Sequence, residues 1–164
     1  MGFAETMLPE FDREMSNTRK VLERVPDDKL TWKPHEKSGS AGWLATHISV
    51  IPVWGKFTIE REFFDLAQEK PLSDVLQSSA AIVDQFDRNV AACRAALSSV
   101  SDERLRGNWT LRRGVQVFFT QPRATLLRAF VMNHLIHHRA QLAVYLRLLD
   151  VPVPALYGPS ADEQ

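Results

Sequence analysis

The stretch Val131-Met-Asn-His-Leu-Ile-His-His-Arg-Ala-Gln-Leu142 decides the fold, and it places His134 and His138 four residues apart. On a helix, this spacing puts both imidazoles on one face, together with apolar residues that face a core. His47, in the apolar stretch 43–49, would add a third nitrogen ligand from a second helix. Three ligands leave one coordination position of a metal ion open, which is typical of catalytic rather than structural sites.

Apolar residues recur at steps of three and four in four stretches of the chain, and this period predicts helices. A proline, Pro26, ends the first stretch, and turn-forming residues at 71–74 precede the third and offer it a cap. The predicted fold class is all-α, a helical bundle in a single domain covering residues 1–164. The expected helices span 3–25, 41 to the mid-60s, about 75–100 and about 123–149.

Three segments depart from this regular pattern. Pro52 inside the second helix predicts a kink, because proline cannot donate to the carbonyl of Ile48. Residues 101–122 hold two glycines and a proline and are predicted to be a crossover connection, in which 115–119 fits an extended piece as well as a helix. The proline-rich 151–160 is expected to be non-helical and to pack along the bundle.

The composition excludes several classes of protein. Lysine and arginine total 20, as do aspartate and glutamate, so no field that attracts nucleic acid is indicated. The single cysteine, Cys93, rules out an intramolecular disulfide and fits a reducing compartment. Because a signal peptide and a run of about 20 apolar residues are both lacking, we expect a cytoplasmic protein without a membrane partner.

The residues next to the histidines restrict which of them can bind a metal ion and which enzyme classes are possible. His137 is turned by about 100° from His138 on a helix, so we treat it as a non-ligand, and likewise His35. Leu135 stands where a zinc protease helix needs a glutamate as general base, which excludes that class. Trp43, Trp54 and Tyr145 are candidates for pocket walls, although core packing is the more usual role for each of them.

One cysteine and three arginines are further candidates for a functional role. Cys93 fits a small buried hydrophobe better than a nucleophile. Arg112 and Arg113 would receive an anionic substrate, unless they lie in a solvated loop. We expect Arg139 to pair with an acid on another helix or at a dimer interface.

The segments Gly42-Trp-Leu-Ala-Thr-His47-Ile and His134-Leu-Ile-His-His138-Arg139-Ala-Gln141-Leu142, followed by Val151-Pro-Val-Pro154 and Tyr157-Gly158, resemble the DinB family of damage-inducible-type bacterial proteins. That family is similar to the bacillithiol S-transferases and the mycothiol-dependent maleylpyruvate isomerases. The resemblance implies His47, His134 and His138 as metal ligands. It also implies an up-down-down-up four-helix bundle with a long crossover before the last helix, and commonly a homodimer.

Three functional hypotheses follow. The first is a metal-dependent thiol S-transferase or related enzyme, in which a divalent ion activates a low-molecular-weight thiol toward an electrophile. Zinc or nickel is the expected ion, with iron or manganese as alternatives. The second is a non-catalytic bundle stapled by its metal, or an interaction protein of a stress response. The third is a metal-dependent hydrolase, which would need Glu10, Glu14 or Glu62 as proton acceptor.

Overall fold

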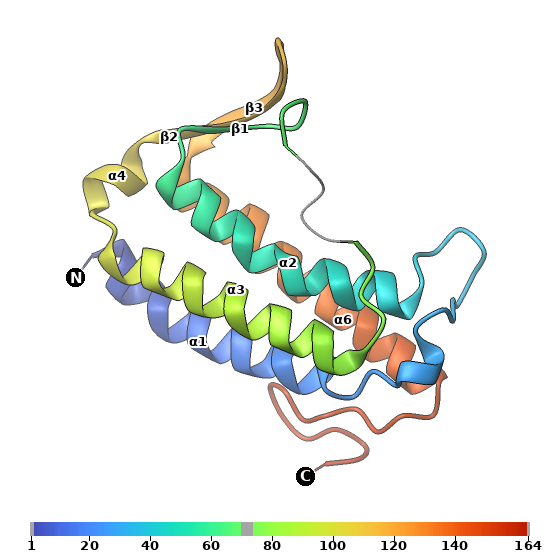
Figure 1. Ribbon diagram of the computed structural model, residues 1–164. Helices are drawn as coiled ribbons and strands as arrows, with labels where there is room; N and C mark the ends of the chain where they lie inside the picture. The colour runs from blue at the N-terminus through green and yellow to red at the C-terminus, as the bar shows by residue number, and fades with distance from the viewer. Residues whose placement is uncertain (1, 70–73, 164) are drawn as a thin grey trace.

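Four long helices form the main body of the computed structural model, which describes residues 2–69 and 74–163 (Figure 1). Each long helix contacts two others: α2 and α1 both pack against α3 and α6. Shorter helices and strands lie between them in the sequence. The helices are α1 (Phe3–Leu22), α2 (Ala41–Glu60), α3 (Ser79–Ser99), α4 (Asp102–Arg106), α5 (Arg123–Leu126) and α6 (Asn133–Leu148), with a 3-10 turn at Asp27–Lys29 and a π-helical segment at Leu127–Met132.

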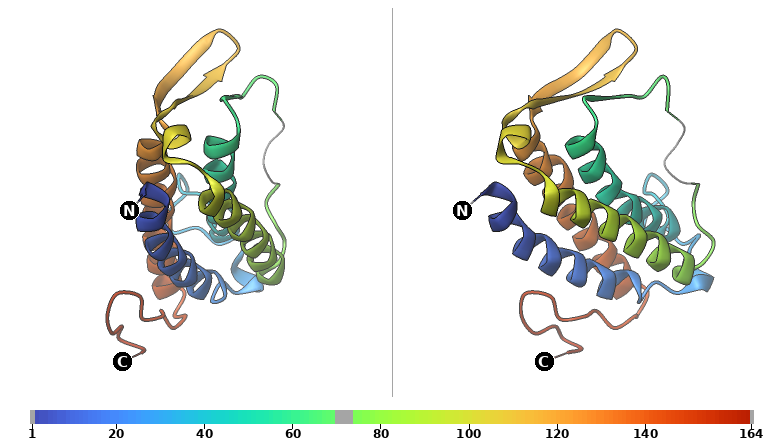
Figure 2. Two further views of the ribbon diagram at one scale, coloured as in Figure 1. Left: turned by 90° about the vertical axis from the view of Figure 1, so that its left-hand side faces the viewer. Right: turned by 60° about the vertical axis from the view of Figure 1, so that its left-hand side comes forward.

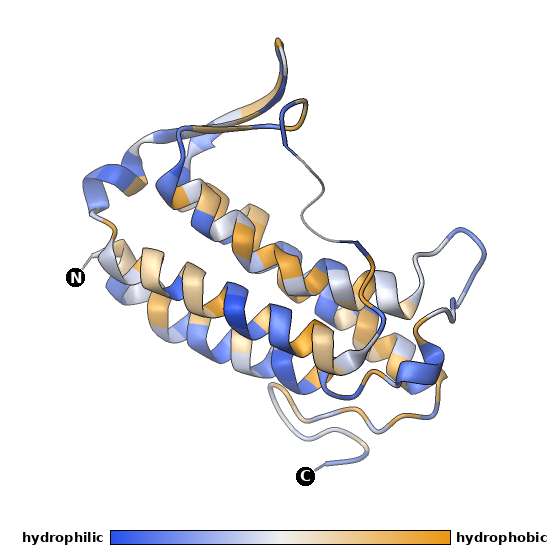
Figure 3. Cartoon of the chain, viewed as in Figure 1, coloured by the Kyte–Doolittle hydropathy of each residue, from blue (hydrophilic) through white to orange (hydrophobic). Residues whose placement is uncertain are grey.

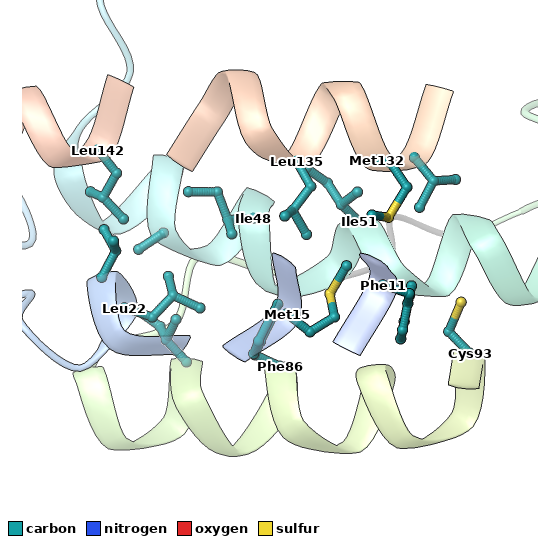
Figure 4. Close-up of a cluster of buried hydrophobic side chains, with 14 of the residues drawn as sticks. Phe11, Met15, Leu22, Ile48, Ile51, Phe86, Cys93, Met132, Leu135 and Leu142 are labelled. Carbon is teal, nitrogen blue, oxygen red and sulfur yellow. The ribbon is translucent and has the colours of Figure 1, made fainter. Parts of the chain in front are cut away.

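The core lies between the long helices. Figure 4 shows buried side chains from α1, α2, α3 and the last helical stretch pointing toward one another, among them Phe11, Ile51, Phe86 and Leu135. In Figure 3, hydrophobic colours dominate α2, whereas α1 and α3 alternate with hydrophilic ones. This difference follows from position, because α2 contacts β1, α5 and the π-helical segment in addition to α3 and α6, and so keeps less of its surface in solvent than α1 and α3 do.

The all-α prediction is incomplete, because the predicted crossover connection 101–122 contains α4 and a β-hairpin. Strand β2 (Asn108–Arg113) pairs antiparallel with β3 (Gln116–Pro122) and parallel with the short β1 (Phe63–Asp65). Figure 2 shows the hairpin at the end of the molecule opposite the C-terminal segment. Gly114 has a φ of +57° at the first position of the two-residue turn, the feature of a type II′ hairpin that glycine provides without strain.

One face of this sheet covers the helices. Phe64, Leu111 and Phe119 occupy the same row across β1, β2 and β3, and all three belong to a second apolar cluster around the buried Trp109. The alternate residues Phe63, Thr110 and Thr120 form a row on the opposite face. The extended reading of 115–119 is therefore correct for the part from Gln116 onward.

Three helix boundaries differ by three or more residues from the predicted ones. α1 ends at Leu22 instead of residue 25. α2 ends at Glu60 instead of the mid-60s, where two arginines from distant segments bind its last carbonyls: Arg104 donates to those of Ile59 and Glu60, and Arg123 to that of Arg61. α3 begins at Ser79, capped by Ser78, so Val75 lies outside the helix. The caps expected at Pro71, Leu72 and Ser73 lie outside the described residues.

The last predicted helix is continuous in space but not uniform. It consists of α5, the π-helical segment and α6, so the backbone geometry changes immediately before His134. α2 continues through Pro52, and the kink expected there stays a prediction. None of the helices in residues 2–69 and 74–163 combines the length and the apolar character that a membrane span requires.

Candidate metal centre

The three predicted histidines meet between α2 and α6. Nε2 of His134 lies 2.9 Å from Nε2 of His138 and 3.3 Å from Nε2 of His47. Donor atoms of the three rings all lie within 4.8 Å of one another, and each residue is partly exposed. The i, i+4 spacing on α6 brings two of the rings together, and the α2–α6 contact supplies the third.

The cluster holds its imidazoles in the neutral form that binds metals. Burial, followed by repulsion from His138 and His134, lowers the pKa of His47 to about 4. Burial is also the main cause that lowers the pKa of His134, opposed in part by the backbone of Phe130. The pKa of His138 is lowered by burial, although its hydrogen bond to Gln141 acts in the other direction. Near neutral pH, all three rings therefore have a lone pair to donate.

Hydrogen bonds within the protein do not satisfy this cluster. Nδ1 of His138 lies 2.7 Å from Oε1 of Gln141, so the proton sits on Nδ1 and Nε2 carries a lone pair. Nε2 of His134 carries either one proton or one lone pair, but it faces Nε2 of both His47 and His138. It can therefore form a good hydrogen bond with only one of these two atoms. Nδ1 of the same ring is buried without a hydrogen-bond partner of normal geometry.

A metal ion fits the donor set better than these hydrogen bonds do. A cation would accept a lone pair from each Nε2 and so satisfy the three rings together. Tetrahedral zinc binds nitrogen at roughly 2.0–2.1 Å, which separates its ligands by about 3.4 Å, close to the separation of His47 and His134. Among the described residues, no carboxylate or thiol joins the group, so a fourth position would be open to a small molecule.

Neighbouring side chains orient the rings. Gln141 fixes His138 by accepting its Nδ1 proton, the usual arrangement for a metal-binding histidine. The indole of Trp43 stacks on His47 with the ring planes 5° apart and the centroids at 5.2 Å. Phe130 lies against His134 with its centroid 5.9 Å away. Gln141 was not predicted from the sequence, although its position three residues after His138 on one helix is a usable signal.

Trp43 lies beside the cluster, whereas Tyr145 packs against the main core, so the wall role stays a prediction for Trp43. Trp43 keeps 45% of its surface exposed and lies directly over Gly39, where a Cβ atom would come within 2.3 Å of the indole. The hydroxyl of Tyr145 donates to the carbonyl of Gly39 at 3.3 Å, and Trp32 packs edge-on against the Tyr145 ring. The loop before α2 is thereby held against α6 next to the histidines.

Trp54 takes the core-packing role instead. It contacts Phe57, Phe64 and Phe130 in the apolar cluster under the sheet. Phe130 is therefore the link between this cluster and His134.

The predicted non-ligands lie outside the cluster. His137 is exposed and touches only the edge of the His138 ring, and His35 is exposed and accepts from the backbone of Lys37. Cys93 is 1% exposed, and burial raises the pKa of its thiol to about 12. The thiol therefore stays protonated, which confirms the interpretation of Cys93 as a core residue.

The structure confirms the prediction for Arg139 but gives Arg112 a different role from the predicted one. Arg139 pairs with Glu14 of α1 at 2.7 Å, and both side chains are buried, so the expected partner on another helix is confirmed. Arg112 pairs with the buried Asp65 and covers the ring of Phe63, which gives it a structural role in the sheet. Arg113 is exposed at the end of β2. Arg112 is therefore held in the sheet, and the binding of an anionic substrate by Arg113 stays a prediction.

The three acids proposed for hydrolysis are engaged with arginines. Glu14 binds Arg139, Glu10 binds Arg128, and Glu62 bridges Arg104 and Arg123. The hydrogen bonds that Arg104 and Arg123 donate to Glu62 lower the pKa of its carboxyl group. None of the three is part of the histidine group, so a carboxylate proton acceptor is not provided by these residues.

Fold and site together define a mostly helical protein with a small sheet and a partly exposed three-histidine cluster able to hold a metal ion. The family model of the DinB family matches residues 1–164, and the chain belongs to that family. Over 162 residues, the chain is 26% identical to the uncharacterized protein YrdA of Bacillus subtilis strain 168. The match covers 95% of this chain and 89% of YrdA.

Solved structures share the fold. A DinB-like protein of Bacillus subtilis, YjoA, superposes with a TM-score of 0.73 at 20% identity, covering 94% of this chain and 99% of that one. A DinB-like protein of Bacillus cereus ATCC 10987 superposes with a TM-score of 0.72 at 24% identity, covering 93% and 97%. At these identities the likeness concerns the fold, and the function of this chain rests on its own site.

Proposed function

We propose that His47, His134 and His138 bind a divalent metal ion and that the protein is a thiol-dependent enzyme of the S-transferase type. The observation that carries this proposal is the convergence of three neutral Nε2 atoms, which cannot all satisfy one another because Nε2 of His134 faces both of the others. The partial exposure of all three residues favours access by a small molecule. Zinc or nickel is the proposed ion, with iron or manganese as alternatives.

A divalent ion at this position would lower the pKa of a thiol bound to it, so that the thiolate is available near neutral pH. In the proposed transfer, the sulfur forms a bond to an electrophilic carbon, the leaving group departs with the bonding electrons, and the thiol proton passes to water. Gln141 holds His138 in the correct tautomer, and Trp43 keeps His47 in place. The exposed part of the Trp43 indole borders the space in which the electrophile would lie.

The finer architecture belongs to the same proposal. We propose that the four long helices form an up-down-down-up bundle in one domain and that the protein is a cytoplasmic homodimer. A small-molecule thiol and an electrophile are the proposed partners. The mutual contacts of α1, α2, α3 and α6 support the bundle.

The first test is elemental analysis of untagged protein. We expect about one divalent ion per chain, lost in His47→Ala, His134→Ala and His138→Ala, because a three-nitrogen site cannot lose one ligand without a large fall in affinity. His137→Ala is the matched control, since this exposed neighbour lies outside the cluster and should leave the metal content unchanged. Equal metal content in all variants, or none in the wild-type chain, would overturn the metal site.

The second test separates catalysis from a structural metal. Protein reconstituted with cobalt should develop a sulfur-to-metal absorption band when cysteine is added, and should then transfer that thiol to an aryl halide. A fall of the melting temperature on chelation, without thiol binding or transfer, would favour the metal-stapled bundle or interaction protein. The hydrolase alternative is weaker because Glu10, Glu14 and Glu62 are held by arginines.

A further inference from the structure

A polar cavity of about 490 Å³ lies where α2 ends, and the three histidines are not among its lining residues. In Figure 1, α4 and the start of β2 lie at the same end of the molecule as the last turn of α2. The cavity is lined by Glu62, Ser101, Glu103, Arg104, Gly107, Asn108 and Arg123. Binding sites for small molecules commonly span about 300–1,000 Å³, so this volume suits such a ligand.

Backbone carbonyls hold the two arginines of this cavity in place. Nε of Arg104 donates to the carbonyl of Ile59 at 2.9 Å. Arg123 is only 2% exposed, and it donates to the carbonyl of Asn108 at 2.6 Å and to that of Arg61 at 3.0 Å. Because these acceptors belong to the main chain, both guanidinium groups keep their positions whichever anion pairs with them.

The carboxylate that bridges the two arginines is the exposed member of the group. Glu62 accepts from Nη2 of Arg123 at 2.9 Å and also from Nη1 of Arg104, yet 68% of its side chain is exposed. An exposed carboxylate holds its partners weakly, because water and salt compete for it. Glu62 can therefore turn into solvent while the arginines stay where they are.

The cavity also has hydrogen-bonding capacity to spare. Nε of Arg123 is buried and has no hydrogen-bond partner in the part of the chain that the structure describes. Ser101 and Asn108 add a hydroxyl and an amide group to the lining, and both groups can donate. Once Glu62 turns away, two guanidinium charges face the single carboxylate of Glu103, so the cavity then favours an anion.

We propose that this cavity binds a phosphate group, free or esterified to a small molecule, on Arg104 and Arg123 in place of the Glu62 carboxylate. Phosphate suits the site because its oxygens accept several hydrogen bonds at once and match the fork of a guanidinium group. Arg123 begins the helical run that reaches His134 eleven residues later. At about 1.5 Å per residue, roughly 16 Å of helix separates the two sites, so the proposal does not depend on the metal or thiol chemistry.

Calorimetric titration with inorganic phosphate and with glycerol 3-phosphate tests the site. Glu62→Gln should bind the preferred probe about tenfold more tightly than the wild-type chain, because the competing carboxylate is gone. Glu69→Gln is the matched control, since it removes the same charge from a carboxylate that pairs with Arg61 and does not line the cavity. Its affinity should equal that of the wild-type chain. The probe that binds more tightly identifies the ligand as free or esterified phosphate.

A second pair of variants tests the opposite charge change. Asn108→Asp adds a negative charge to the lining and should weaken phosphate binding about tenfold or more. Gln116→Glu adds the same charge at the far end of the hairpin and should leave the affinity unchanged. Both residues are exposed, so both variants should fold, which circular dichroism verifies.

Three results would overturn the proposal. The first is that neither probe binds to the wild-type chain or to Glu62→Gln. The second is equal affinity of Glu62→Gln and Glu69→Gln for both probes. The third is equal affinity of Asn108→Asp and Gln116→Glu, which would place any bound phosphate outside this cavity.

Discussion

Gln141 is the residue that links the helix sequence most directly to the proposed chemistry. Its Oε1 accepts the Nδ1 proton of His138 and so leaves Nε2 of that ring as a donor. We expect Gln141→Leu to weaken metal affinity about 10- to 100-fold, because partners of this kind fix the tautomer and orientation of a ligand. Competition with a chromophoric chelator measures the change.

Gln68→Leu is the control for this prediction, since Gln68 is also exposed but lies in the turn after β1. Its metal affinity should match that of the wild-type chain. If Gln141→Leu binds metal as tightly as this control, then the hydrogen bond to His138 has no part in positioning the ligand.

At the same scale, the sequence predicted the position of the histidines but not the residues around them. His134 and His138 are placed by helix geometry alone, so their proximity follows from the spacing. His47 joins them only because α2 packs on α6, which the apolar stripe of each helix favours. The stacking of Trp43 on His47 could be anticipated from their i, i+4 spacing, whereas the unsatisfied Nδ1 of His134 depends on the assembled core.

At the scale of elements, Gly55 controls how closely α2, α3 and the π-helical segment approach. A Cβ atom at this position would lie 2.5 Å from Sγ of Cys93, and 3.5 and 3.7 Å from Val131 and Leu127. Gly55→Ala should therefore destabilise the protein by about 1–3 kcal/mol, although alanine in a helix is otherwise favoured. Urea unfolding followed by circular dichroism measures this change.

The Cys93→Ala background provides the control for Gly55→Ala. Because the clash is with Sγ, removing that atom should make the glycine substitution neutral or stabilising by about 0.5–1 kcal/mol. Equal effects of Gly55→Ala in both backgrounds would show that the contact between Gly55 and Cys93 does not limit the helix approach.

Elements formed by long-range contacts were the ones that the sequence did not predict. A short apolar run such as 115–119 has no period that separates strand from helix, so the hairpin became visible only with its partner strands. The end of α2 depends on Arg104 and Arg123, which lie more than 40 residues away along the chain. The π-helical segment before His134 has no marker residue of its own in the sequence.

At the scale of the whole molecule, the buried pair of Arg139 and Glu14 ties α6, α1 and the C-terminal segment together. Arg139 also donates to the carbonyl of Glu14 and to the hydroxyl of Thr18. The hydroxyl of Tyr157 donates to the Glu14 carboxylate at 2.6 Å, and the side chain of Asn17 donates to the carbonyl of Leu156. The tail therefore packs along the helices, as its prolines and apolar residues predicted, and the charged pair lies at the centre of that contact.

Removing one charge of the Glu14–Arg139 pair should lower the free energy of unfolding more than removing both charges. Glu14→Leu and Arg139→Leu each leave one buried charge without its counterion, so we expect each to lower the free energy of unfolding by about 3–5 kcal/mol. The double variant leaves neither charge, so its loss in free energy of unfolding should be clearly smaller than the sum of the losses of the two single variants. Urea midpoints measure the cycle, and the exposed pair Arg88 and Asp84, expected to contribute under about 1 kcal/mol, is the control. Strict additivity at Glu14 and Arg139 would mean that their charges do not interact, and that α1, α6 and the tail are held together by apolar packing and by hydrogen bonds such as that of Asn17 to Leu156.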